Sequence, residues 1–232
     1  MKEFTERHHA FIAAAFYDEL TKAFGERGKA AFVQATQRYA EQRGSRMAQR
    51  AIRDGKPLNF QTYKEYGEWV NTKTVIDAQE NNQSTNLQWS PDLVTKITRC
   101  PWAIEFASLG MQEGGVVYCT HLDKAIVRGF NPYLVFNTTQ SLHDHEYCIQ
   151  ISEGANFAEG QTFVRDPKNQ RGFDYHCGHS YKTYSQITEA IFSSEGRKIS
   201  ANVLDRFAER YGRDMADKLL SYRNVDFDVI DD

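Results

Sequence analysis

The strand-like sequence of this chain forms a single block, which begins near Leu87 and ends near Ser152. Before this block, apolar residues recur at helical spacing, and the same periodicity returns from about Ser180. Within it, β-branched residues recur near every second position, which is typical of strands. Strands grouped between helices favour an α+β protein over a doubly wound sheet. We therefore expect N-terminal helices, a small, mostly antiparallel sheet with inserted short helices, and C-terminal helices.

Glycine, proline and polar residues divide these regions into elements. Gly25 and Gly28 end the first helix, a second helix is expected over 29–53, and Thr62 is expected to cap a short third helix. The elements expected beyond residue 86 are a strand over 87–100 interrupted at Pro91, helices over 101–110 and 113–127, paired strands over 134–142 and 146–152, a long loop over 153–171, and helices over 180–192 and 200–220. Long loops of this kind often form or cover binding sites.

Length and charge limit the classes of function. A chain of 232 residues can bury one substantial core, so we expect a single domain over 1–232, with a helical part (1–75) and an α+β part (76–232). The net charge of -3 favours neither nucleic acid nor an anionic membrane as a partner. No apolar run approaches the ~20 residues of a membrane span, and the charged N-terminal segment is unlike a signal peptide. We expect a cytoplasmic protein with reduced thiols.

Thiols and imidazoles are concentrated in the α+β part. Three of the four cysteines and three of the seven histidines lie between Cys100 and Cys148, and Cys177 follows between two further histidines. These side chains carry out nucleophilic, acid–base and metal chemistry near neutral pH. Their concentration in the middle of the chain indicates a reaction centre.

Cys119 is the strongest candidate nucleophile in this region. Asp123 follows it by one helical turn, so the thiol and the carboxylate are expected on one helix face. The alternative is that Cys119 is a small buried hydrophobic residue, as free cysteines often are.

Two pairs of histidines have different expected roles. His176 and His179 are three residues apart at an expected helix start, where they can form half of a metal site or a base with the group that orients it. The alternative is an N-terminal turn that uses its polar side chains as caps. His143 and His145 are expected in the turn of a solvated hairpin, on the opposite side from Cys148.

Arg46, Arg50 and Arg53 form a basic stripe on the second helix. Such a stripe is usually a solvated face; the alternative is that a guanidinium group binds a substrate carboxylate through two parallel hydrogen bonds. Glu105, which follows Cys100-Pro101, is a candidate for holding a cationic amidine.

Several segments in this order resemble the L-2-amino-thiazoline-4-carboxylic acid hydrolase family: GSRMAQRA, CPWAIEFASLG, YCTHLDKAIVRGFNP, EYCIQIS and YHCGHSY. The resemblance runs from about Gly44 to the helix after His179. It implies the opening of a cyclic isothiourea that carries a carboxylate, on a route to cysteine. The positions it carries over are Cys100, Glu105, Cys119, Asp123, Asn131, Cys148, His176 and His179.

The resemblance and the residue chemistry together lead to a mechanistic hypothesis. Cys119 attacks the carbon of the C=N bond, His179 is the acid–base group, and His176 supports it. Glu105 and Asp123 contact the amidinium, and Arg46 or Arg50 takes the carboxylate. Asn131, Cys100 and Cys148 complete the substrate-binding set, and no cofactor is needed.

Two alternatives remain at the level of sequence. In one, zinc is bound by His176, His179 and a cysteine such as Cys119, and its bound water attacks the ring. In the other, the chain is a small-molecule binding or sensor domain without catalysis. The expected partner in each case is a small-molecule carboxylate, and a second copy of the chain can pack on the aromatic N-terminal helices.

Overall fold

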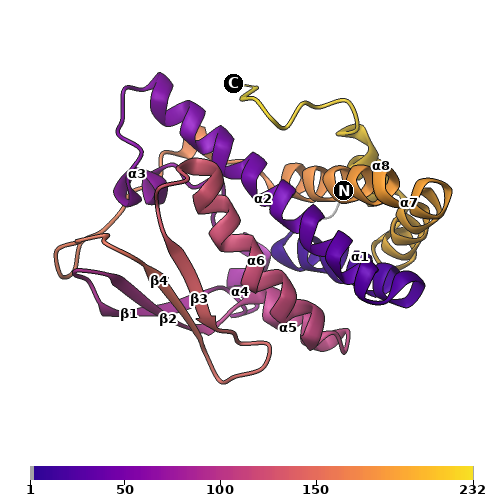
Figure 1. Ribbon diagram of the computed structural model, residues 1–232, viewed down its shortest axis with the longest axis horizontal. Helices are drawn as coiled ribbons and strands as arrows, with labels where there is room; N and C mark the ends of the chain where they lie inside the picture. Colours follow the sequence, from indigo (N-terminus) through magenta and orange to yellow (C-terminus); the bar gives the residue numbers. More distant parts are fainter. Residues whose placement is uncertain (1–2, 232) are drawn as a thin grey trace.

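The computed structural model describes residues 3–231 and has an α+β fold (Figure 1). In chain order its elements are α1 (Glu6–Phe24), α2 (Glu26–Arg53), α3 (Phe60–Glu65), α4 (Lys73–Asp77), β1 (Gln83–Gln88), β2 (Leu93–Arg99), α5 (Pro101–Ser108), α6 (Gln112–Phe130), β3 (Phe136–Gln140), β4 (Cys148–Ser152), the 3-10 turn η1 (Pro167–Asn169), α7 (Phe173–Tyr211) and α8 (Arg213–Ser221). The expected order of N-terminal helices, a small antiparallel sheet and C-terminal helices is therefore confirmed.

The boundaries of the N-terminal helices are set by a glycine and by a capping residue. Gly25, with φ of 55°, separates α1 from α2, because glycine adopts this left-handed conformation without steric cost. The expected cap of the third helix is wrong. Asn59 is the N-cap, and its side chain accepts a hydrogen bond from the backbone N–H of Thr62 at 3.0 Å, so Thr62 lies inside the helix.

The sheet has the strand order β1-β2-β4-β3, with every neighbouring pair antiparallel. The expected pairing of the two later strands is confirmed, since Thr138 of β3 lies opposite Gln150 of β4. The sequence around Pro91 forms a hairpin, β1–β2, where one interrupted strand was expected. Side chains at alternate positions share a face, so Ile97 and Cys148, which are register partners, point the same way as Gln150.

Helix α6 lies between the sheet and α2 and brings the two parts of the fold together (Figure 1). The helices α2 and α6 approach closely because glycine occupies both sides of their contact. A Cβ atom on Gly44 would lie 2.0 Å from the carbonyl oxygen of Ile126, and one on Gly129 would lie 2.3 Å from the carbonyl oxygen of Glu41. Side chains of α2 therefore reach the same space as side chains of α6.

The C-terminal helices begin earlier than expected. Helix α7 starts at Phe173, is interrupted by the non-helical backbone of Ser193, and is separated from α8 at Gly212. The segment after α8 runs back along α2, where the carbonyl oxygen of Phe227 accepts a hydrogen bond from Arg46 at 2.6 Å. Between β4 and α7 the chain is the expected long loop, with only the turn η1 within it. Over residues 3–231, no helix combines the length and the apolar character needed to cross a membrane.

Candidate active site

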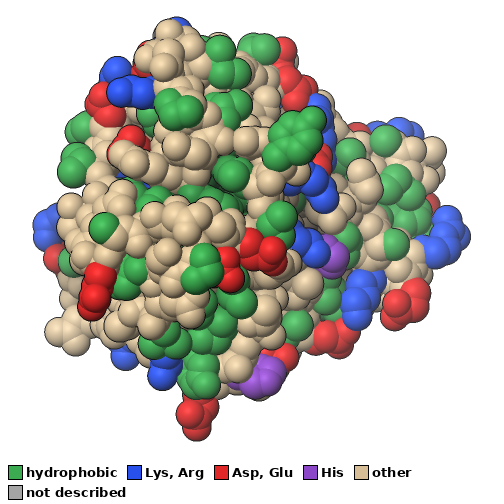
Figure 2. Space-filling model, turned by 60° about the vertical axis from the view of Figure 1, so that its left-hand side comes forward, with side chains coloured by type: hydrophobic (Ala, Val, Ile, Leu, Met, Phe, Trp, Pro, Cys, Tyr) green, Lys and Arg blue, Asp and Glu red, His purple; other side chains and the backbone are tan. Residues whose placement is uncertain are grey.

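A cavity of about 240 Å³ lies between α6, α2 and the sheet, and three of the four cysteines line it. Figure 2 shows the molecule with the sheet end brought forward; this face is hollowed, and apolar side chains lie within the hollow. The polar side chains that line the cavity include Arg43, Tyr63, Lys64, Asn82, Cys100, Tyr118, Cys119, Asp123, Thr138, Cys148, Gln150 and Arg165. A larger surface depression of about 610 Å³ near the start of α7 contains none of the candidate residues, so its size does not make it the reaction centre.

Local geometry explains why the three thiols converge. Cys100 is the N-cap of α5, directly after β2. Cys148 opens β4 opposite Ile97 of β2, and Cys119 projects from the neighbouring helix α6. All four cysteines are free thiols, as the sequence predicts.

Cys119 and Asp123 both line the cavity, as their helical spacing predicts. The carboxylate of Asp123 accepts a hydrogen bond from Gln150 of β4 at 2.8 Å. Burial raises the pKa of Asp123 to about 6, although Arg43, Lys64 and the bond from Gln150 act in the opposite direction. Asp123 keeps some accessible surface because that surface faces the cavity. This carboxyl group therefore changes charge near neutral pH.

The thiols of the cavity are protonated at neutral pH. Burial raises the pKa of Cys100 to about 12 and also raises the pKa values of Cys119 and Cys148. Asp123 adds to each of these shifts, because a carboxylate disfavours a nearby thiolate. A reaction that uses one of these thiols as a nucleophile therefore needs a base within reach of the sulfur.

The imidazole beside Cys119 belongs to His143. Its Nε2 lies 3.2 Å from the Cys119 sulfur, and its side chain is buried, with 7% of its surface exposed. A Cβ atom on Gly115, one turn before Cys119, would lie 2.1 Å from Nδ1 of His143, so glycine makes the space for this ring. Burial lowers the pKa of His143 to about 4, which keeps it neutral. The expectation of a solvated turn histidine is therefore wrong for His143, while His145 is exposed.

His176 and His179 lie on another cluster, around Glu68. His179 donates from Nε2 to the side chain of Gln42 at 2.9 Å, accepts from Arg46 at 3.5 Å, and stacks on Phe227. His176 donates from Nε2 to the carbonyl oxygen of Glu68 at 3.2 Å. Both ring nitrogens of His179 are thus occupied, and burial and Arg46 lower its pKa well below the usual value. The structure does not bring either ring to Cys119.

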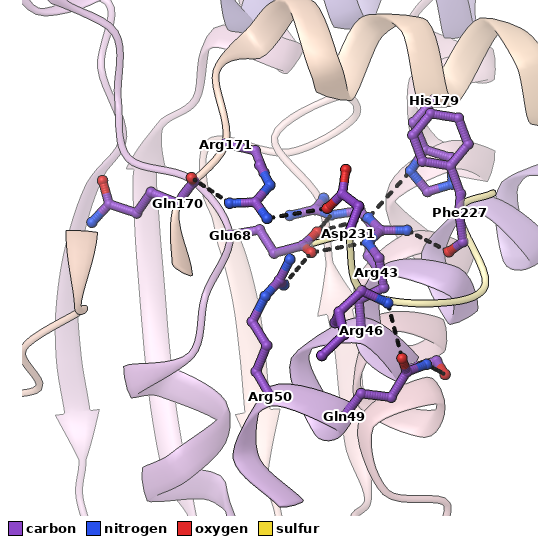
Figure 3. A network of polar contacts seen from close by, with 12 residues as sticks. Arg43, Arg46, Gln49, Arg50, Glu68, Gln170, Arg171, His179, Phe227 and Asp231 are labelled. Atoms are coloured by element: carbon purple, nitrogen blue, oxygen red, sulfur yellow. Dashed lines mark hydrogen bonds and ion pairs between the residues drawn. The ribbon is translucent and has the colours of Figure 1, made fainter. Parts of the chain in front are cut away.

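Arg46 and Arg50 are fully buried and bind Glu68 (Figure 3), so the expectation of a solvated stripe is wrong for both; Arg53 is exposed. Burial alone raises the pKa of Glu68, but Arg46 and Arg43 outweigh it and the pKa falls to about 2. These two arginines are engaged by this carboxylate and do not line the cavity, which is where the sequence-based hypothesis needed them for substrate.

Two further candidates lie away from the cavity. Glu105 is fully buried; it accepts hydrogen bonds from Arg7 at 2.8 Å and from Arg210 at 2.9 Å. Asn131 ends α6, where its side chain donates to the carbonyl oxygen of Leu58 at 2.7 Å. Both contacts join segments distant in sequence, which gives each residue a structural function.

The donors of the zinc alternative also lie apart. His176 and His179 belong to the Glu68 cluster, whereas Cys119 belongs to the cavity. Within residues 3–231, no three His, Cys, Asp or Glu side chains are arranged to hold a metal ion.

Sequence reasoning missed two residues that line the cavity, Arg43 and Gln150, and one that contacts Cys119, His143. Arg43 extends the Arg46 and Arg50 stripe by one turn, and Gln150 shares the strand face of Cys148, so spacing contained a signal for both. His143 carried no such signal, because its contact with Cys119 depends on how the hairpin folds back over α6.

Comparison with known protein families gives one match. A family model described as L-2-amino-thiazoline-4-carboxylic acid hydrolase matches residues 5–148, more than half of the chain. The chain belongs to this family. The part that matches this hydrolase family contains Cys119, Asp123, Arg43 and His143, and it ends before His176 and His179. Comparison with curated proteins and with solved structures finds no match.

Proposed function

We propose that this chain is a hydrolase that opens a small cyclic amidine or isothiourea ring bearing a carboxylate, of the 2-aminothiazoline-4-carboxylate type. Family membership supports the reaction class. The observation that carries the proposal is the position of Cys119, whose thiol lines the cavity one turn from Asp123 and contacts His143 at 3.2 Å. A nucleophile, an anion for the amidinium and a base are thereby gathered in one small space.

Asp123 is the proposed binding group for the amidinium. Gln150 holds one carboxylate oxygen at 2.8 Å, so the group is fixed before substrate enters. A protonated amidine gives two N–H donors to a carboxylate and has an electron-poor central carbon. Binding at Asp123 therefore orients this carbon toward the thiol one turn away.

Cys119 is the proposed nucleophile and His143 its base. The sulfur forms a bond to the ring carbon while its proton passes to Nε2 of His143, and the π electrons of the C=N bond move to the ring nitrogen. The C–N bond then breaks; its electron pair stays on this nitrogen, which takes the proton back from His143. Water then adds to the carbon and gives one proton to His143. The C=O bond forms as the Cys119–carbon bond breaks, the proton on His143 returns to the sulfur, and the second proton of the water passes to the released amine. The net change is one water added and one ring opened, with no cofactor.

This arrangement accommodates the raised thiol pKa. A protonated thiol beside a neutral imidazole is a resting pair in which the proton moves only as the sulfur attacks. The positive amidinium next to the sulfur favours its negative charge at that moment. In this role His143 replaces His179, whose ring nitrogens are already engaged.

A second candidate function is a binding or sensor domain for the same kind of ligand. The observation that favours it is the raised pKa of the three cavity thiols, which is the usual state of buried cysteines that do not react. In that case the cavity holds the ring and releases it unchanged.

The test is to incubate the protein with 2-aminothiazoline-4-carboxylate and to measure ring opening by mass spectrometry, as the addition of one water. We expect turnover by the native chain and a loss of about 10⁴-fold or more in Cys119→Ala. Thr120→Ala, at the exposed neighbouring position, is the matched control and should keep full activity. Saturable binding measured by calorimetry without any turnover would instead support the sensor. Full activity of Cys119→Ala would remove the nucleophile from the proposal.

A further inference from the structure

Arg43 is a buried cation on the wall of the cavity. It lies on α2 with 5% of its surface exposed, and it lines the same cavity as Cys119 and Asp123. Its Nε has no hydrogen-bond partner among the residues that the structure describes. Such a buried, unsatisfied donor is uncommon in proteins, and it shows that the hydrogen-bonding capacity of Arg43 is not fully used within the described residues.

Arg43 forms an ion pair with Glu68 but no hydrogen bond to it. Glu68 lies 3.7 Å from Nε, beyond hydrogen-bond distance. Both oxygens of Glu68 are already used: one accepts from Arg46 at 3.1 Å and Arg50 at 2.8 Å, and the other from Arg46 at 2.9 Å (Figure 3). Three guanidinium groups therefore gather at one carboxylate, and of these three arginines Arg43 is the one that lines the cavity.

The charges of the cavity wall match a ligand with two opposite charges. Asp123 is the acidic side chain on this wall, and Arg43, Lys64 and Arg165 are the basic ones, counted over the described residues. Arg165 is exposed and donates to the carbonyl oxygen of Trp69 at 2.7 Å. Lys64 is half-buried and offers a single point charge. Arg43 combines burial with a planar fork, which is the geometry that binds a carboxylate through two parallel hydrogen bonds.

We infer that Arg43 binds the carboxylate of the substrate and makes the site selective for rings that carry a carboxylate (the acidic ring) over otherwise identical rings that lack it. This inference rests on the proposed function, because it takes this cavity as the active site. From the sequence, Arg46 or Arg50 was the expected partner of the substrate carboxylate. In the structure these two side chains bind Glu68 instead.

The experiment is a comparison of two ligands and two forms of the protein. The ligands are 2-aminothiazoline-4-carboxylate and 2-aminothiazoline, which lacks only the carboxylate. Their dissociation constants are measured by calorimetry in the Cys119→Ala chain, so that neither ring is opened, and again after adding Arg43→Met. We expect Arg43→Met to weaken binding of the acidic ring about 10- to 100-fold and to change binding of 2-aminothiazoline less than about threefold.

Two further variants protect the result. Arg43→Lys keeps the positive charge but removes the planar guanidinium, so it should lose part of the preference for the acidic ring. If Arg43→Met fails to fold, Arg43→Lys provides the test in its place. Lys64→Met tests the rival cation and should leave the preference for the acidic ring close to that of the native chain. The inference would be overturned if the Arg43 variants weakened the binding of both ligands equally. It would also be overturned if Lys64→Met alone lost the preference for the acidic ring, or if neither ring bound.

Turnover by the native chain separates this inference from the proposed function. If the native chain opens the acidic ring while the Arg43 variants keep the preference for it, only the role of Arg43 is wrong. If the ring is bound with the expected dependence on Arg43 but is never opened, the hydrolase proposal fails and the binding role of Arg43 stands.

Discussion

The guanidinium of Arg46 makes two hydrogen bonds to the carboxylate of Glu68, through Nε at 3.1 Å and Nη2 at 2.9 Å, and both side chains are fully buried. Arg50 adds a third bond at 2.8 Å. This cluster joins α2 to the segment after α3, because Arg46 and Arg50 of α2 bind Glu68, which also pairs with Arg43. Because each charge is removed from water, the loss of one partner leaves the others uncompensated.

Replacement of Glu68 is therefore expected to destabilise the fold strongly. Glu68→Gln should lower the free energy of unfolding by about 3–5 kcal/mol. The control is Glu41→Gln, which removes the partly exposed pair with Arg128 and should cost about 0–1 kcal/mol. Urea denaturation monitored by circular dichroism measures both. Equal stability of the two variants would show that the buried cluster contributes no more than a surface pair.

The close approach of α2 and α6 gives a second prediction. Alanine normally stabilises a helix relative to glycine, but at Gly44 its Cβ would lie 2.0 Å from the carbonyl oxygen of Ile126. Gly44→Ala should therefore lower the free energy of unfolding by about 1–3 kcal/mol, as overpacked substitutions do. Gln34→Ala, at an exposed position of the same helix, should change it by less than about 0.5 kcal/mol. A stabilised Gly44→Ala protein, measured in the same urea titration, would contradict this packing.

Elements set by local chemistry could be predicted from the sequence. Pro101 begins α5 because its fixed φ suits the first helical position. Cys119 and Asp123 share the cavity because the distance of one turn places them on one helix face. The strands around Thr138 and Gln150 pair as predicted, because both segments contain the β-branched residues that favour strands.

Contacts that depend on tertiary approach could not be predicted in the same way. Arg46 looks like part of a solvated stripe until Glu68 is brought beside it from another segment. His143 looks like a hairpin turn residue until the turn folds back over α6 and meets Cys119. No periodicity in the sequence indicates that Glu68 pairs with Arg46 or that Cys119 contacts His143. The buried charge cluster and the imidazole of the candidate site could therefore be found only from the fold.

Gly115 provides a test of the contact between Cys119 and His143. A methyl group on Gly115 would lie 2.1 Å from Nδ1 of His143, so Gly115→Ala should displace the ring from the sulfur. If His143 is the base, kcat for ring opening should fall about 10²- to 10⁴-fold, as it does when a general base is lost. His143→Gln should show a similar loss, while calorimetric binding of the substrate to both variants stays close to the native value. Native kcat in both variants would exclude the imidazole from the reaction.

The pKa of Asp123 predicts how substrate binding depends on pH. Burial raises this pKa to about 6, so the group is neutral below pH 6 and negative above it. Because only the carboxylate attracts an amidinium, kcat/KM should rise as pH increases through about 6, while the substrate amidine stays protonated. His143, with its pKa lowered to about 4, stays neutral over this range and does not produce the rise.

The variant Asp123→Asn separates this effect from stability. A folded pKa raised from 3.8 to about 6 contributes stability that is complete below pH 3.8 and is lost as pH rises through 6. Asp123→Asn should therefore be at least as stable as the native chain at pH 7, by thermal unfolding, while its kcat/KM is low and loses the rise near pH 6. If the same rise persists in Asp123→Asn, another group binds the amidinium.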